Sequence, residues 1–246
     1  MMFRQRFLSA SKVYDWTTGP VITIPSQTPG ITPLPEVAVV SAATGSYLGT
    51  GTTGVSVTTG TVAGGDLIIV VGGMSNDSSA LVTPTASGLT FTQVHKTTTG
   101  TYSAGVWWAV SPDATSRTIK VATGSSNAAV LYGAVIVVRN VATPPVDVAG
   151  AAATFAATPT PTAASVTPAG HSMVFAYMVA SNYSTYTENP TVTQSGWTQQ
   201  ASFRQNQWGG MCVASKVVDA EATGTVAFAQ SVSADGMSGS FALRNY

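Results

Sequence analysis

Gly65-Asp66-Leu67-Ile68-Ile69-Val70-Val71 returns 105 positions later as Gly170-His171-Ser172-Met173-Val174-Phe175-Ala176. The same offset separates Val138-Arg139-Asn140-Val141 from the last four residues, Leu243-Arg244-Asn245-Tyr246. A third pair of stretches, Ser-Gly-Leu-Thr and Ser-Gly-Trp-Thr, is 108 positions apart, which indicates a short loop insertion between strands. The chain therefore carries two tandem copies of one unit, and a duplicated unit points to a fold or a surface more than to a single reaction centre.

This repeat predicts three parts: residues 1–36, a first copy at 37–141 and a second copy at 142–246. Five prolines from Pro20 to Pro35 break any regular element, so we expect the first part to be an extended N-terminal arm. An arm that carries many aromatic and basic side chains is expected to dock on a partner. These candidate docking residues are Phe3, Arg4, Arg6, Phe7, Lys12, Tyr14 and Trp16. The alternative is an arm folded back over the first copy.

Both copies predict strands and no helix of more than a single turn. Short segments rich in Val, Ile, Thr, Tyr and Trp alternate with Gly, Ser, Asn and Pro. The strands expected in the first copy are Val37–Val40, Gly54–Thr58, Leu67–Val71, Leu89–Val94, Gly105–Val110, Thr118–Ala122 and Ala134–Val138. Those expected in the second are Val146–Ala149, Ser165–Thr167, Met173–Val179, Trp197–Ala201, Met211–Val217, Gly224–Ala229 and Ser238–Leu243. We therefore expect an all-β fold of two tandem antiparallel β-sandwiches, with a jelly-roll-like topology preferred to an immunoglobulin-like one.

Three features predict which side chains are buried. The continuous apolar run Leu67–Val71 indicates a strand that is covered on both faces or lies at the centre of a sandwich. Successive side chains of a strand point to opposite sides, so one ring of the pair Trp107-Trp108 is expected in the core and the other outside it or under a neighbour. Trp197 takes the place of Leu89 in the repeat and is expected in the core.

Composition excludes several classes of protein. Ten basic and ten acidic residues cancel, so the chain lacks the basic footprint of a nucleic-acid-binding protein. One cysteine and two histidines provide neither a disulfide framework nor a zinc site. No apolar run reaches the length of a signal peptide or a membrane span, so we expect synthesis and assembly in a cytoplasm and no membrane partner. Charged residues are only 8% of the chain, against roughly 25% on average. A surface with so few charges is either partly covered by other chains or made polar by Thr and Ser.

Catalytic patterns are missing from the sequence, and a binding face is its best local signal. His95 and His171 sit at non-equivalent positions of the repeat without a nucleophile motif, and no carboxylates are paired, so we expect no enzyme activity and no cofactor. Asn76-Asp77 and Asp113 are interpreted as turn residues and not as calcium ligands. Tyr183, Tyr186 and Trp208 lie among amides and hydroxyls, which suits contact with a glycan or a protein.

Five stretches carry a resemblance to a known family: Gly65-Asp66-Leu67-Ile68-Ile69-Val70, the Ser-Gly-Leu-Thr and Ser-Gly-Trp-Thr stretches at Ser87–Thr90 and Ser195–Thr198, Trp107-Trp108-Ala109-Val110, and Val137–Val141. Together they resemble β-sandwich modules of tailed-bacteriophage virion proteins, above all the minor tail proteins of phages that infect actinobacteria. The match covers roughly residues 37–246. Two positions depart from the family pattern: the closing strands end in Arg-Asn, and the second copy has Gly170-His171 where the family has Gly-Asp.

The resemblance implies a virion protein, assembled in the host cytoplasm and without catalytic residues. Together with the arm, it leads us to expect a minor tail or tail-tip protein that is anchored by its arm, exposes two sandwiches and contacts other virion proteins and copies of itself. Two alternatives stay open: a capsid decoration protein on the phage head, and a carbohydrate-binding adhesion module for the host surface.

Overall fold

The computed structural model describes residues 35–48, 54–75, 80–99, 102–124, 130–181, 186–205 and 209–245. Every regular element in these ranges is a β-strand, and none of the described residues belongs to a helix that could cross a membrane. Residues 35–246 cluster into one compact unit, called the body below. The expectation of an all-β protein is confirmed.

The first copy forms two antiparallel sheets. Its larger sheet has the order β1-β7-β3-β5-β4, and β2 pairs with β6 in a separate sheet. The bounds of these strands are β1 Ala38–Leu48, β2 Gly54–Thr58, β3 Leu67–Ser75, β4 Thr92–Thr98, β5 Tyr102–Val110, β6 Thr118–Ala122 and β7 Val130–Arg139. The segment between β3 and β4 extends the smaller sheet through isolated bridges from Leu81 to Thr123 and from Thr85 to Lys120.

The second copy repeats this arrangement. Its larger sheet has the order β13-β14-β11-β16-β8, with β9 pairing beside β8 on β16, and its smaller sheet has the order β10-β15-β12. The bounds are β8 Val141–Ala149, β9 Ala153–Thr158, β10 Thr162–Ala163, β11 His171–Ser181, β12 Thr191–Val192, β13 Thr198–Gln205, β14 Gly209–Asp219, β15 Val226–Ala229 and β16 Ala234–Asn245. The duplication read from the sequence is thus a duplication of strand order.

The strand order favours the jelly-roll topology. In an immunoglobulin sandwich the first two strands share one sheet. Here β1 and β2 belong to different sheets, as do β6 and β7, so the chain passes back and forth between the two layers. The equivalent strands of the second copy, β8 and β10, and β15 and β16, are divided in the same way.

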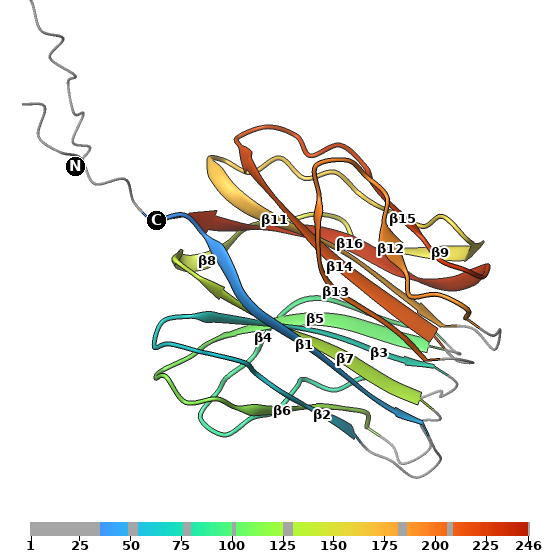
Figure 1. Cartoon of the computed structure of the whole chain (residues 1–246), viewed down its shortest axis with the longest axis horizontal. Coiled ribbons are helices and arrows are strands. Elements are labelled where there is room, and N and C mark those ends of the chain that lie inside the picture. Colours follow the sequence, from blue (N-terminus) through green and yellow to red (C-terminus); the bar gives the residue numbers. More distant parts are fainter. Residues whose placement is uncertain are drawn as a thin grey trace, which may run out of the picture. The chain divides into compact units, whose positions relative to one another are not determined.

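The two larger sheets pack face to face, so the body has four layers (Figure 1). A central core between them combines β3 and β7 of the first copy with β11 and β16 of the second, including Ile69, Ile136, Phe175 and Phe241. Each copy also has an outer core between its larger and smaller sheets, one containing Trp107 and the other Trp197. We call the central one the shared core, because neither copy completes it alone.

The sheets face each other in reversed order. β1 lies near β13, β3 lies near β11, and β4 lies near β16. This arrangement relates the two copies by an approximate two-fold axis near the central strands β3 and β11. Every strand edge on one side of the body therefore has a counterpart on the other side.

Strand β3 shows why its sequence is apolar throughout. Leu67, Ile69 and Val71 point into the shared core, whereas Ile68 and Val70 point into the outer core of the first copy. Neighbouring β5 places Trp107 in that outer core, where a Cβ added at Gly105 would lie 2.2 Å from its ring. Gly105 thus leaves the space that the Trp107 ring fills. The prediction that Leu67–Val71 of β3 is covered on both faces is confirmed.

The outer strands of the larger sheets carry devices that disfavour pairing with another chain. β8 contains Pro144 and Pro145, which lack the N–H that a further strand needs. β4 and β13 have register shifts beside Gln93 and Gln199, and such bulges interrupt a ladder of hydrogen bonds. Strand addition by a partner is therefore disfavoured at β4, β8 and β13.

Only Asn140 separates β7 from β8, and thus the first copy from the second. Its φ of 62° reverses the chain in one residue, and asparagine tolerates this left-handed conformation better than most side chains. Its side-chain nitrogen donates to the Glu36 carbonyl at 2.8 Å. This short joint leaves the two copies no freedom to separate as hinged domains.

Candidate functional site

The sequence-predicted contact residues fall in two groups. The seven arm residues, Tyr183 and Trp208 lie outside the described residues, so their roles stay predictions. Tyr186 is described and is only 1% exposed. Its hydroxyl donates to Gln230 Oε1 at 3.0 Å, and burial raises its pKa. Its ring belongs to the outer core of the second copy and offers no face to a ligand, which corrects the expectation for this residue.

Polar side chains at the border between the copies lock them together. The Tyr102 hydroxyl of β5 donates to the carbonyl of Gly236 in β16 at 2.7 Å. The Tyr132 hydroxyl of β7 donates to the carbonyl of Ala180 in β11 at 2.6 Å. Both rings are buried, so each hydroxyl gains a partner that water cannot supply. The sequence gives no hint of these contacts, because they depend on how the copies pack.

His95 is the centre of a third contact across this border. Its Nε2 lies 2.8 Å from the Gly150 carbonyl, and its Nδ1 lies 2.7 Å from the Tyr177 hydroxyl. A carbonyl can only accept, so Nε2 carries the proton and Nδ1 accepts from Tyr177. Neutral imidazole fits both partners, and His95 is 8% exposed. This geometry supports a structural role for a residue that an enzyme could use as a base.

Acid is expected to weaken the body through His95. Burial lowers the pKa of His95, although its hydrogen bond to Gly150 acts in the opposite direction. The unfolded chain takes up the proton at about pH 6.5, whereas the folded chain resists it to lower pH. The contribution of neutral His95 to the free energy of unfolding is therefore fully present above about pH 6.5. It is lost as the pH falls toward the lowered pKa of the folded state.

Urea unfolding of the wild type and of His95→Gln between pH 7.5 and pH 5 checks this expectation. The two proteins differ only at residue 95, so the quantity of interest is the difference between the two curves. The wild type should lose more stability on acidification than His95→Gln. Parallel curves would show that His95 takes up its proton equally well in both states.

Each larger sheet ends in an ion pair that involves the arginine of its closing strand. In the first copy, Arg139 Nε and Nη2 donate to Asp66 Oδ1 and Oδ2 at 2.8 and 2.7 Å. In the second copy, Arg244 Nε donates to Asp147 Oδ1 at 3.0 Å. In the second copy the uncharged Ser172 lies opposite Arg244, and Arg244 pairs with a carboxylate of β8 instead. His171 itself pairs with Asp219 at the end of β14.

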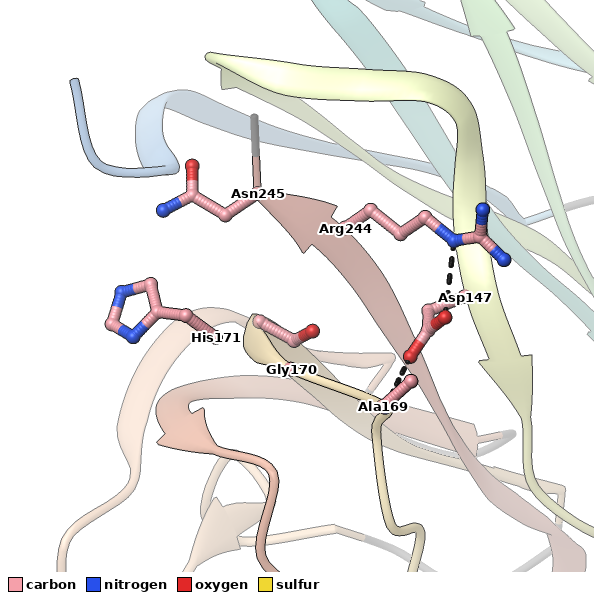
Figure 2. Close-up of a pocket in the computed structure, with 7 residues that line it drawn as sticks. Asp147, Ala169, Gly170, His171, Arg244 and Asn245 are labelled. Carbon is pink, nitrogen blue, oxygen red and sulfur yellow. Dashed lines mark hydrogen bonds and ion pairs between the residues drawn. The ribbon is translucent and has the colours of Figure 1, made fainter. Parts of the chain in front are cut away.

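Figure 2 shows the hollow around the ion pair of Arg244 and Asp147. It has a volume of about 490 Å³ and is lined by Asp147, Ala169, Gly170, His171, Ser172, Arg244 and Asn245. Asp147 also accepts from the Ala169 backbone N–H at 2.7 Å, so each of its oxygens has a partner. The charged groups of this hollow thus neutralise one another within the strand ends. We interpret it as the rim of the sheet and not as a ligand site.

A second hollow lies at the border between the copies. Its volume is about 300 Å³, and its walls come from β4 and β5 of the first copy and β8 of the second. Trp108 forms part of this wall, and its ring is only partly buried, whereas Trp107 is fully buried. The expectation of one ring in the core and the other outside it or under a neighbour is confirmed, because Trp108 packs at the edge of the shared core, beside β8. We call this hollow the Trp108 groove.

Reactive groups are few among the described residues. No group of three or more potential metal ligands occurs among them. Cys212 is buried in the outer core of the second copy, and burial raises its pKa to about 12, so its thiol stays protonated at neutral pH. His95 and His171 are on different strands, and each is held by a hydrogen bond described above. Nothing in this part of the chain assembles a nucleophile, a base and an oxyanion site.

Comparison with known proteins adds no relatives. The sequence matches no family model, and neither a curated protein nor a solved structure shows significant similarity to it. The function is therefore argued from the geometry of the chain itself.

Proposed function

We propose that this chain is a structural component of a tailed-phage virion, most closely a minor tail or tail-tip protein, and not an enzyme. The observation that supports this role is the shared core, which joins two sandwiches into one block instead of two mobile domains. A block with a one-residue joint keeps its outer surfaces at fixed positions, as a repeated part of a particle requires. Its scarcity of charge also suits a surface that is partly covered by neighbouring chains.

In this proposal the arm attaches the body to the particle. Four large aromatic side chains, each contributing roughly 2 kcal/mol when buried, offset much of the entropy lost on ordering an arm. Arg4, Arg6 and Lys12 would pair with carboxylates of the scaffold. The partners are other virion proteins and further copies of the chain.

Deleting residues 1–34 tests the proposal. The deletion starts the chain at Pro35 and keeps Glu36, whose carbonyl is bonded to Asn140, and Val37, which is buried. We expect the shortened protein to keep the thermal stability of the body and to be missing from purified particles. A matched variant keeps the arm at full length and replaces its aromatic side chains by serine (Phe3, Phe7, Tyr14, Trp16); it should be missing as well.

Particles produced by complementation, and separated into heads and tails, give the readout. Full-length protein in the tail fraction and loss of both variants supports the proposal. Full-length protein in the head fraction would favour capsid decoration instead. Normal incorporation of the shortened protein would refute the anchoring role of the arm, and absence of the full-length protein from every particle would refute the virion role.

A further inference from the structure

The two copies differ at the Trp108 groove. In β4 and β5, Thr92 pairs with Trp108 just before the register shift. In β13 and β14, Thr198 pairs with Ser215 just before the equivalent shift. Ser215 is therefore the counterpart of Trp108, and it is 4% exposed and accepts from Gln200 Nε2 at 2.8 Å. One copy closes this position with a small polar pair, and the other presents an indole ring.

The groove's lining indicates the chemistry of a ligand. Among the residues that the structure describes, no charged side chain lines it. Trp108, Val94 and the two prolines of β8 provide apolar walls, and Thr92, which pairs with Trp108 across the strands, is exposed beside them. The Thr92 hydroxyl both donates and accepts hydrogen bonds, so it suits a ligand whose own groups do both. A flat indole face packs well against a rigid ring with an apolar side.

These features fit a pyranose sugar, which has C–H groups on one face of its ring and hydroxyls around its edge. We propose that the Trp108 groove binds a neutral hexopyranose residue of a surface polysaccharide. Trp108 stacks on the apolar face of the sugar, and the Thr92 hydroxyl bonds a hydroxyl at its edge. The volume of about 300 Å³ accommodates one such residue with its neighbours in the chain extending into solvent.

A peptide fits the same groove less well. A bound peptide in an edge groove usually gains affinity by adding a strand to the sheet. The register shift between Gln93 and His95 interrupts the ladder that β4 could offer. On the opposite wall, Pro144 and Pro145 have no N–H to donate. A ligand that uses side-chain contacts alone is therefore favoured.

Sugar binding in this groove goes beyond the structural role proposed above. It rests on the proposed function only for the source of the sugar, which would be the surface of the host. Its test uses the purified full chain and neutral probes: methyl glycosides of glucose, galactose and mannose, and a neutral glycan array. We expect millimolar binding of a monosaccharide, followed by NMR through the indole N–H of Trp108 and by saturation transfer to the sugar. Trp108→Ser introduces the residue that the second copy has at this position, and it should weaken binding by about tenfold or more.

Matched variants separate stacking from folding. Trp108→Phe keeps an aromatic ring and should retain most of the binding, whereas Ser215→Ala alters the symmetric position and should leave it unchanged. Thermal unfolding of each variant shows whether the fold persists. If Trp108→Ser unfolds, the NMR shifts of the wild type still show whether the sugar binds at Trp108. The proposal is overturned by a flat response to every neutral sugar, by shifts that avoid Trp108, or by preferential binding of acidic sugars or proline-rich peptides. Trp108→Ser should still enter particles, so loss of sugar binding and loss of the virion role are distinguishable.

Discussion

Residues 35–140, produced without the second copy, are expected to self-associate instead of forming a soluble monomer. Separation would expose the face of the larger sheet that now lies in the shared core, including Leu67, Ile69 and Ile136. Each large aliphatic side chain moved into water costs roughly 1.5–3 kcal/mol, and a continuous apolar face of this kind drives association. Tyr102 and Tyr132 would also lose the carbonyls that their hydroxyls now reach.

Size-exclusion chromatography of each fragment alone, and of both produced together, measures this effect. Fragments 35–140 and 141–246 are expected to aggregate or oligomerise when alone and to elute as a one-to-one complex when combined. Two soluble monomers, each unfolding cooperatively at the temperature of the intact chain, would show that the shared core contributes little. The joined chain is the control for any damage from the new termini.

Phe241→Ala is expected to destabilise the whole body by about 3–5 kcal/mol. Phe241 is 1% exposed and stacks on Phe175, with ring centroids 5.6 Å apart and an interplanar angle of 14°. Both rings belong to the second copy, but they face the first copy across the shared core. For a body of this size, the loss corresponds to a decrease in Tm of roughly 6–20 °C.

The shape of the transition is as informative as its midpoint. Because the two copies share a core, scanning calorimetry should show a single transition that moves as a whole. Val217→Ala is the control: this side chain is 40% exposed, and its removal should change stability by only about 0.5 kcal/mol. Two transitions, of which only one shifts, would mean that the copies unfold independently.

The sequence predicted strands that bury one or both faces and missed those that bury little. β2 and β6 have the bounds expected from their alternation, and β3 begins where its apolar run begins. β9 lies at a sheet edge with mostly exposed side chains, and β10 and β12 have two residues each, so neither hydrophobicity nor length marks them. The segment Ser165–Thr167, expected as a strand, lies outside the strands because the chain pairs earlier, at β10.

The sequence could not predict how the two copies pack against each other, and the reason is physical. An apolar run such as Leu67–Val71 shows that both faces are covered, but any second layer could provide the cover. Tyr186 illustrates the same limit, since an aromatic residue among polar neighbours gives no sign of whether its ring is buried. The Trp108 groove was predicted only in part. Alternation along the strand placed the two tryptophan rings on opposite faces, but only the fold brings the prolines of β8 opposite the Trp108 ring.

The reversed packing of the larger sheets gives one chain the geometry of a two-subunit assembly. The smaller sheets β2–β6 and β10–β15–β12 lie on opposite outer sides of the four layers. They belong to corresponding parts of the two copies but differ in sequence, so a neighbour on one side meets a different set of side chains from a neighbour on the other. A single polypeptide can thereby distinguish its two sides, which an identical pair of subunits could not do, and this gives any array built from it a direction.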